Sequence, residues 1–88
     1  MNVENIVREH LAETLGYSSE QSKELKLDAD LFDHYGLTSL TMVMLMTTIC
    51  PAAKIQLSAL TDRDVAKLHT PQDIINLIDE KLAQTEGI

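Results

Sequence analysis

The hydroxyl group of Ser39 has the most promising position for chemistry in this sequence. It follows Tyr35-Gly36-Leu37-Thr38 and precedes an apolar run from Leu40 to Cys50, and no charged residue appears from His34 to Ala53. A serine after such a turn is most often the N-cap of a helix, where its side chain accepts a backbone hydrogen bond. The position also suits a phosphorylated or phosphate-bearing hydroxyl, because the N-terminal N–H groups and the helix dipole stabilise negative charge.

The remaining groups that could do chemistry lack the partners which their chemistry needs. The histidines show neither a triad arrangement with a serine nor the paired spacing of metal ligands: His10, His34 and His69. Three aspartates suggest a calcium loop, but the EF-hand's glycine and terminal glutamate are missing: Asp28, Asp30 and Asp33. Cys50 is the only cysteine, which excludes an internal disulfide and favours a half-buried structural thiol. We therefore predict no catalytic residue and no metal site.

The net negative charge of the chain argues against some classes of binding partner. The 88 residues carry 14 acidic and 7 basic side chains, a net charge of −7, which disfavours binding to nucleic acid or to anionic membranes. The N-terminus lacks the basic and apolar regions of a signal peptide. The apolar run 40–50 is far shorter than the ~20 residues that a bilayer requires. We expect a cytoplasmic protein with neither nucleic-acid nor membrane partners.

The hydrophobic pattern predicts an all-α fold, a small four-helix bundle of one domain. Apolar residues recur at helical spacing in four segments, and no segment alternates like a strand. The predicted helices lie at about 3–15, 39–50, 62–68 and 71–84, with a long loop at 16–37.

Local signals set the expected ends of these helices. Asn2 is a candidate N-cap and Gly16 a candidate C′ residue for the first helix. Pro51 is expected to stop the second helix. Thr70-Pro71-Gln72-Asp73 has the pattern of a capping box with proline at the first helical position.

Several apolar residues outside the main helices are expected to contact the core. In the loop 16–37 these are Leu25, Leu27, Leu31 and Phe32, and after the second helix they are Ile55 and Leu57. Residues 19–26 have a weak helical pattern. In the second helix, Met42, Leu45, Met46 and Ile49 share one broad face, which we expect to be buried.

The stretch from Leu31 to Leu40 resembles the modification motif of the acyl carrier proteins. That motif has an apolar pair, a short spacer, Gly, an apolar residue, Asp, Ser and Leu. The segments 62–68 and 70–74 resemble the family's short acidic third helix and capped fourth helix, so the resemblance covers nearly the whole chain. It implies that a phosphopantetheinyl transferase, using coenzyme A and magnesium, attaches 4′-phosphopantetheine to Ser39.

The resemblance also implies a carrier that is not an enzyme. The thiol of the arm would hold acyl groups as thioesters and present them to acyl-loading and acyl-processing enzymes. The cargo would be sheltered between the second and third helices. Partner recognition is expected around Ser39 and on the third helix, at Leu37, Thr38, Leu40, Thr41, Met44, Thr47, Asp62 and Asp64.

Two departures from the family pattern point to a specialised carrier. Thr38 stands where the family usually has Asp, which removes a charge beside Ser39 and places recognition by a generic transferase in doubt. The usual acidic row of the second helix is replaced by Thr41, Met44, Thr47, Cys50 and Pro51. A neutral, partly apolar partner surface should be less sensitive to salt. The pattern favours a dedicated route, such as lipid or polyketide biosynthesis, over housekeeping fatty acid synthesis.

Two alternatives remain open. Within the carrier class, the alternative is an aminoacyl or peptidyl carrier that works with an adenylating enzyme. From the residues alone, the chain could also be a small helical docking domain in which Ser39 is only a helix cap. We expect a monomer, although exposed apolar residues on the second helix would permit weak self-association.

Overall fold

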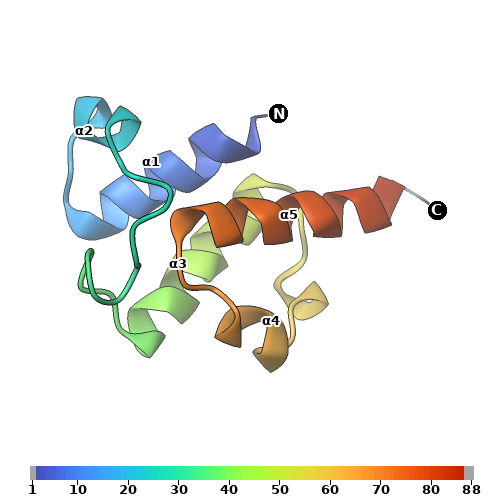
Figure 1. The fold of residues 1–88 in the computed structure, drawn as a ribbon. Helices are drawn as coiled ribbons and strands as arrows, with labels where there is room; N and C mark the ends of the chain where they lie inside the picture. Colours follow the sequence, from blue (N-terminus) through green and yellow to red (C-terminus); the bar gives the residue numbers. More distant parts are fainter. Residues whose placement is uncertain (1, 87–88) are drawn as a thin grey trace.

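The computed structural model describes residues 2–86, and all regular structure within that range is helical. Three longer helices form the body: α1 (Val3–Leu15), α3 (Ser39–Ala52) and α5 (Pro71–Glu86). Three shorter elements connect them: α2 (Ser19–Lys23), the 3₁₀ turn η1 (Leu57–Ala59) and α4 (Asp62–Ala66). The helix α1 packs against α2, α3 and α5, and α4 lies beneath α5 in Figure 1.

The ends of α1 and the start of α5 follow the local signals in the sequence. Asn2 accepts a hydrogen bond from the N–H of Asn5 at 3.1 Å, and Gly16 ends α1 with a left-handed φ of 77°. Thr70 and Asp73 form the predicted reciprocal pair, with each side chain accepting from the other's N–H at 3.2 and 3.1 Å. Local side-chain chemistry was sufficient to place these boundaries.

The predicted loop 16–37 contains a short helix that the sequence analysis treated as a weak pattern. Ser18 and Gln21 form a capping box around the start of α2: Gln21 N–H donates to Ser18 Oγ at 3.2 Å, and Ser18 N–H donates to Gln21 Oε1 at 2.8 Å. The signal was present as serine followed three residues later by glutamine. Its five residues show too little hydrophobic periodicity to stand out from a loop.

The prediction that Pro51 ends the second helix was wrong, because α3 continues through Pro51 to Ala52. Proline costs a helix one N–H donor and crowds the carbonyl four residues earlier, and here the helix ends only one residue after it. The chain leaves α3 through Lys54, whose φ is 61°, and the N–H of Ile55 donates back to the carbonyl of Cys50 at 2.8 Å. This left-handed exit closes the helix.

The third helix is shorter than the predicted 62–68. Regular α-helix ends at Ala66, after which Lys67 and Leu68 donate to the carbonyls three residues earlier, Asp64 and Val65. Such bonds tighten the turn without continuing an α-helix. The buried side chain of Leu68 then fixes the chain to the core before α5 begins.

The core lies between α1, α3 and α5 and contains the predicted face of α3. Its members include Val7, Leu11, Leu31, Met42, Leu45, Met46, Ile49, Ile74 and Ile78. Two predictions need correction. Cys50 is fully buried rather than half-buried, and burial raises the pKa of its thiol. Leu57 is 46% exposed and is not pinned to the core, unlike Ile55.

No helix within residues 2–86 has the length and hydrophobicity that crossing a membrane would require.

Candidate functional site at the N-terminal end of α3

The N-cap of α3 is Thr38, so the expectation that Ser39 could be the cap was wrong. Thr38 has an extended backbone, and its Oγ1 accepts a hydrogen bond from the N–H of Thr41 at 3.2 Å. Its carbonyl accepts the first bond of the helix, from the N–H of Met42 at 2.9 Å. Ser39 is therefore the first residue inside the helix, and the capping role belongs to its neighbour.

The hydroxyl of Ser39 is exposed and forms no hydrogen bond with the other residues that the structure describes. The other three hydroxyl side chains of α3 are engaged. Thr41 Oγ1 lies 2.9 Å from Thr38 Oγ1, while Thr47 and Thr48 donate to the carbonyls of the residues three positions earlier. Ser39 thus presents the one uncommitted hydroxyl on this helix.

A tight turn brings the chain to this position. Gly36 has a φ of 73°, a left-handed conformation that glycine adopts without steric cost. Its N–H donates to the carbonyl of Phe32 at 3.0 Å, and the N–H of Leu37 donates to the carbonyl of Leu31 at 3.0 Å. Leu37 is only 7% exposed, so it anchors the turn in the core. Leu37 therefore supports the turn from within the core, and its predicted role as a partner contact stays a prediction.

The segment before this turn is held at several points. Asp30 Oδ2 accepts from the N–H groups of Phe32 and Asp33 at 2.9 and 2.7 Å. The hydroxyl of Tyr35 accepts from the N–H of Lys26 at 2.8 Å and lies 2.9 Å from the Lys26 carbonyl, to which it donates. Desolvation by burial raises the pKa of Tyr35. The loop is therefore a defined support for Ser39.

Arg8 holds the other half of the same loop against α1. Its Nη1 lies 3.3, 3.2 and 2.8 Å from the carbonyl oxygens of Ser22, Lys23 and Leu25, and its Nε donates to Glu4 at 3.0 Å. By its helical position in the sequence, Arg8 is expected only on the exposed face of α1. No local sequence signal could have paired it with carbonyls 14 to 17 positions away.

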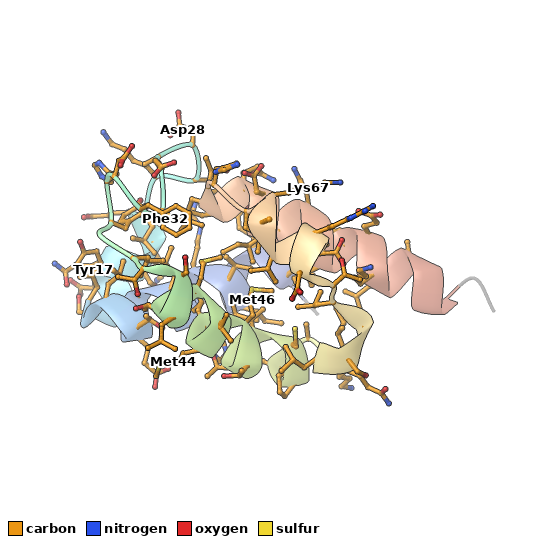
Figure 2. The ribbon with its side chains drawn as sticks, turned by 90° about the horizontal axis from the view of Figure 1, so that it is seen from below. Tyr17, Asp28, Phe32, Met44, Met46 and Lys67 are labelled. Atoms are coloured by element: carbon orange, nitrogen blue, oxygen red, sulfur yellow. The ribbon has the colours of Figure 1, made fainter. Side chains whose placement is uncertain are left out.

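The outer face of α3 is uncharged and partly apolar. Leu40, Val43 and Met44 are 71%, 48% and 59% exposed, and Thr47 is exposed beyond them. Figure 2 shows Met44 pointing away from the molecule and Met46 pointing into it. Val43 was missed by the sequence analysis, although its helical spacing from Leu40 could have placed it on this face.

The remaining predicted contacts lie either in the core or on α4. Cys50, which was matched to the partner face, is buried and unavailable to a partner. Asp62 and Asp64 are on α4, where Asp62 is exposed and Asp64 bonds the N–H of Thr61 at 3.0 Å. Asp64 also pairs with Lys81 of α5 at 3.3 Å. Hydrogen bonding to the Thr61 backbone is the main cause that lowers the pKa of Asp64, with Lys81 adding to it.

Among residues 2–86, no three histidine, cysteine or acidic side chains are grouped as ligands for a metal ion.

The comparison with protein families gives a match to the phosphopantetheine attachment site over residues 5–78. This span includes most of α1, all of α2, α3, η1 and α4, and the first half of α5. The comparison with curated proteins gave no match.

The chemistry at the start of α3 fits such a group. Attachment requires an accessible hydroxyl, and Ser39 provides one that no described residue engages. The phosphate of the arm is an anion, and the exposed N-terminal end of a 14-residue helix favours an anion. The chain therefore belongs to the family of phosphopantetheine attachment domains, non-catalytic carriers that bear 4′-phosphopantetheine.

Proposed function

We propose that Ser39 is the attachment residue and that the protein is an acyl carrier. The observation that carries this proposal is that capping of α3 and exposure of a hydroxyl fall on two different residues, Thr38 and Ser39. Thr38 satisfies the capping requirement, which leaves the adjacent Ser39 hydroxyl exposed and free for modification. Ser39 also lies inside the family-matched span 5–78.

In this role, the chain contributes position rather than catalysis. When bound, the arm supplies a terminal thiol that carries an acyl group as a thioester. The buried side chains of α3, together with the turn at Gly36 and Leu37, fix the hydroxyl that bears the arm. A phosphopantetheinyl transferase would load the arm from coenzyme A, and acyl-loading and acyl-processing enzymes would then use it.

The face formed by Leu40, Val43, Met44 and Thr47 is proposed as the main docking surface for these enzymes. It lies on the same helix as Ser39, and α3 carries no charged side chain. Recognition by apolar contact should change little with ionic strength, because screening acts only on charges. Such a surface supports a specialised pathway with dedicated partners.

The first experiment measures intact mass after incubation with coenzyme A, magnesium and a broad-specificity phosphopantetheinyl transferase. The native chain should gain one phosphopantetheine, and Ser39→Ala should gain none. Thr41→Ser, which retains a hydroxyl two residues away, is the matched control and should still be loaded. Loading of Ser39→Ala would place the arm elsewhere and overturn the assignment.

Thr38→Asp should be tested in parallel. A transferase that requires an acidic residue before the serine would not modify the native chain but would modify this variant. If neither the native chain nor correctly folded Thr38→Asp gains mass, Ser39 is not an attachment residue for such a transferase. Loading of either one supports the assignment.

The docking surface is tested by the rate at which the transferase attaches phosphopantetheine to the protein. Met44→Glu should lower kcat/KM for the transferase several-fold by placing a charge in an apolar contact, whereas Thr14→Glu on the exposed side of α1 should not. The native rate should vary less than about threefold between about 0.05 and 0.5 M salt. A steep loss of rate with salt would show that charged residues elsewhere direct recognition.

The acyl carrier is distinguished from an aminoacyl or peptidyl carrier by its cargo. Mass analysis of the loaded arm from the producing cell would find an acyl thioester in the first case and an aminoacyl thioester in the second. The docking-domain alternative required Ser39 to be the cap of α3, and Thr38 has that role.

A further inference from the structure

We propose that Thr38 is a positioning residue for the phosphodiester of the arm. This inference rests on the proposed attachment at Ser39 and concerns how the first turn of α3 would hold the phosphate. Thr38 would act by capping the helix with a neutral hydroxyl and by leaving the donors beside Ser39 available.

The cap determines which backbone donors remain available. Thr38 Oγ1 occupies the N–H of Thr41, and the Thr38 carbonyl occupies the N–H of Met42. The N–H groups of Ser39 and Leu40 have no acceptor among the residues that the structure describes. These two donors lie at the positive end of the helix, next to the proposed attachment oxygen.

The hydroxyl groups of Thr38 and Thr41 supply a third donor. Their oxygens lie 2.9 Å apart, so one hydroxyl donates to the other. Two hydroxyls carry two protons, and this bond uses only one of them. Whichever threonine donates within the pair, the second proton remains available to a phosphate oxygen.

The absence of negative charge at this end of α3 also favours a bound phosphate. The first turns of α1, α2, α4 and α5 contain acidic residues, at Glu4, Glu20, Asp62, Asp64 and Asp73. The first turn of α3 contains none, and its cap is uncharged. A phosphodiester on Ser39 would therefore meet the helix dipole without a carboxylate of the same turn opposing it.

The test compares the unloaded and loaded proteins by thermal unfolding. In the native chain, the loaded form should melt about 1–8 °C above the unloaded form, as expected for an anion at a helix N-terminus in a domain of this size. In Thr38→Asp, this gain should disappear or change sign. Asp still caps the helix, so the unloaded variant folds, but its carboxylate repels the phosphate and accepts the Thr41 hydroxyl proton.

Two controls separate a local effect from a general one. Thr38→Ser keeps a neutral hydroxyl cap and should keep the gain. Thr61→Asp makes the same charge change at the N-cap of α4, a different helix, and should shift the loaded and unloaded forms equally. An equal gain in the native chain and in Thr38→Asp would overturn the proposal, as would a loss in Thr61→Asp as large as in Thr38→Asp.

Amide NMR gives a second readout that does not depend on stability. Loading should move the N–H resonances of Ser39 and Leu40 downfield in the native chain, and less so in Thr38→Asp. Failure of the proposed function would appear earlier and differently, as the absence of any mass gain at Ser39. If the arm is attached but the N–H resonances of Ser39 and Leu40 do not move, the positioning role of Thr38 is contradicted while the attachment at Ser39 stands.

Discussion

The side-chain oxygen of Thr38 accepts a hydrogen bond from the backbone N–H of Thr41 at 3.2 Å, so the residue beside Ser39 closes the start of α3. Capping and modification therefore fall on two adjacent side chains rather than on one. A hydroxyl that caps a helix is committed to the fold, whereas one at the next position is free for chemistry. This separation leads directly to a prediction about stability.

Thr38→Ala should destabilise the protein more than Ser39→Ala. Loss of an N-cap side chain costs about 1 kcal/mol, whereas an exposed substitution outside such a feature stays within about 0.5 kcal/mol. Alanine also favours the helix interior over serine. Urea unfolding of the two unloaded variants measures the difference, and equal losses would mean that Ser39 shares the capping role.

Tyr35→Phe should lower the free energy of unfolding by about 1–2 kcal/mol, because it removes both hydrogen bonds between the phenol and the backbone of Lys26. Amide hydrogen exchange at Lys26 should accelerate in the same variant. Tyr17→Phe is the matched control, because Tyr17 is exposed and its hydroxyl bonds no other described residue. Unchanged exchange at Lys26 would show that the phenol does not secure the loop.

Arg8→Met should lower the free energy of unfolding by about 1.5–3 kcal/mol. The variant keeps an apolar stem but removes the charged donor to three carbonyl groups between Ser22 and Leu25. Glu4→Gln removes the exposed ion pair with Arg8 and the acidic charge in the first turn of α1, and should cost about 0.5–1 kcal/mol. If the two variants unfold at the same urea concentration, Arg8 contributes through its ion pair and not through the loop.

The stabilising effect of Asp64 should depend on pH. Its folded pKa is lowered from the usual 3.8 by the backbone of Thr61 and by Lys81, so the native state favours the charged carboxylate. That contribution is complete above the unfolded pKa and is lost as the pH falls through the folded pKa. Asp64→Asn should therefore melt below the native protein at about pH 6.5, with a smaller gap at about pH 3. Asp62→Asn controls for the charge change on α4, and a gap that grows on acidification would contradict this sign.

Local sequence signals determined much of this fold. Asn2 and Gly16 bound α1, and the Thr70–Asp73 pair begins α5, because each cap depends on side chains within a few residues of the backbone that it satisfies. The buried face of α3 followed from helical spacing for the same reason. The motif around Ser39, together with the segments 62–68 and 70–74, also indicated the family that the comparison then showed.

Other features depend on contacts between segments that are distant in the sequence. The N–H of Leu31 donates to the carbonyl of His69 at 2.7 Å, and Arg8 reaches carbonyls beyond α2. No periodicity encodes such pairs, because they exist only once the helices have packed. The exposure of Leu57 and the complete burial of Cys50 also depend on how the helices pack against one another.

At the site itself, the sequence alone determined that a hydroxyl would lie at the start of an uncharged apolar helix. It favoured Ser39 as the cap of that helix, although threonine and serine are both good N-caps. The tertiary structure decided for Thr38, because the turn at Gly36 and the burial of Leu37 set the register in which the chain enters α3. Burying Leu37 leaves Thr38 extended as the cap and places Ser39 in the first turn, where its hydroxyl faces solvent.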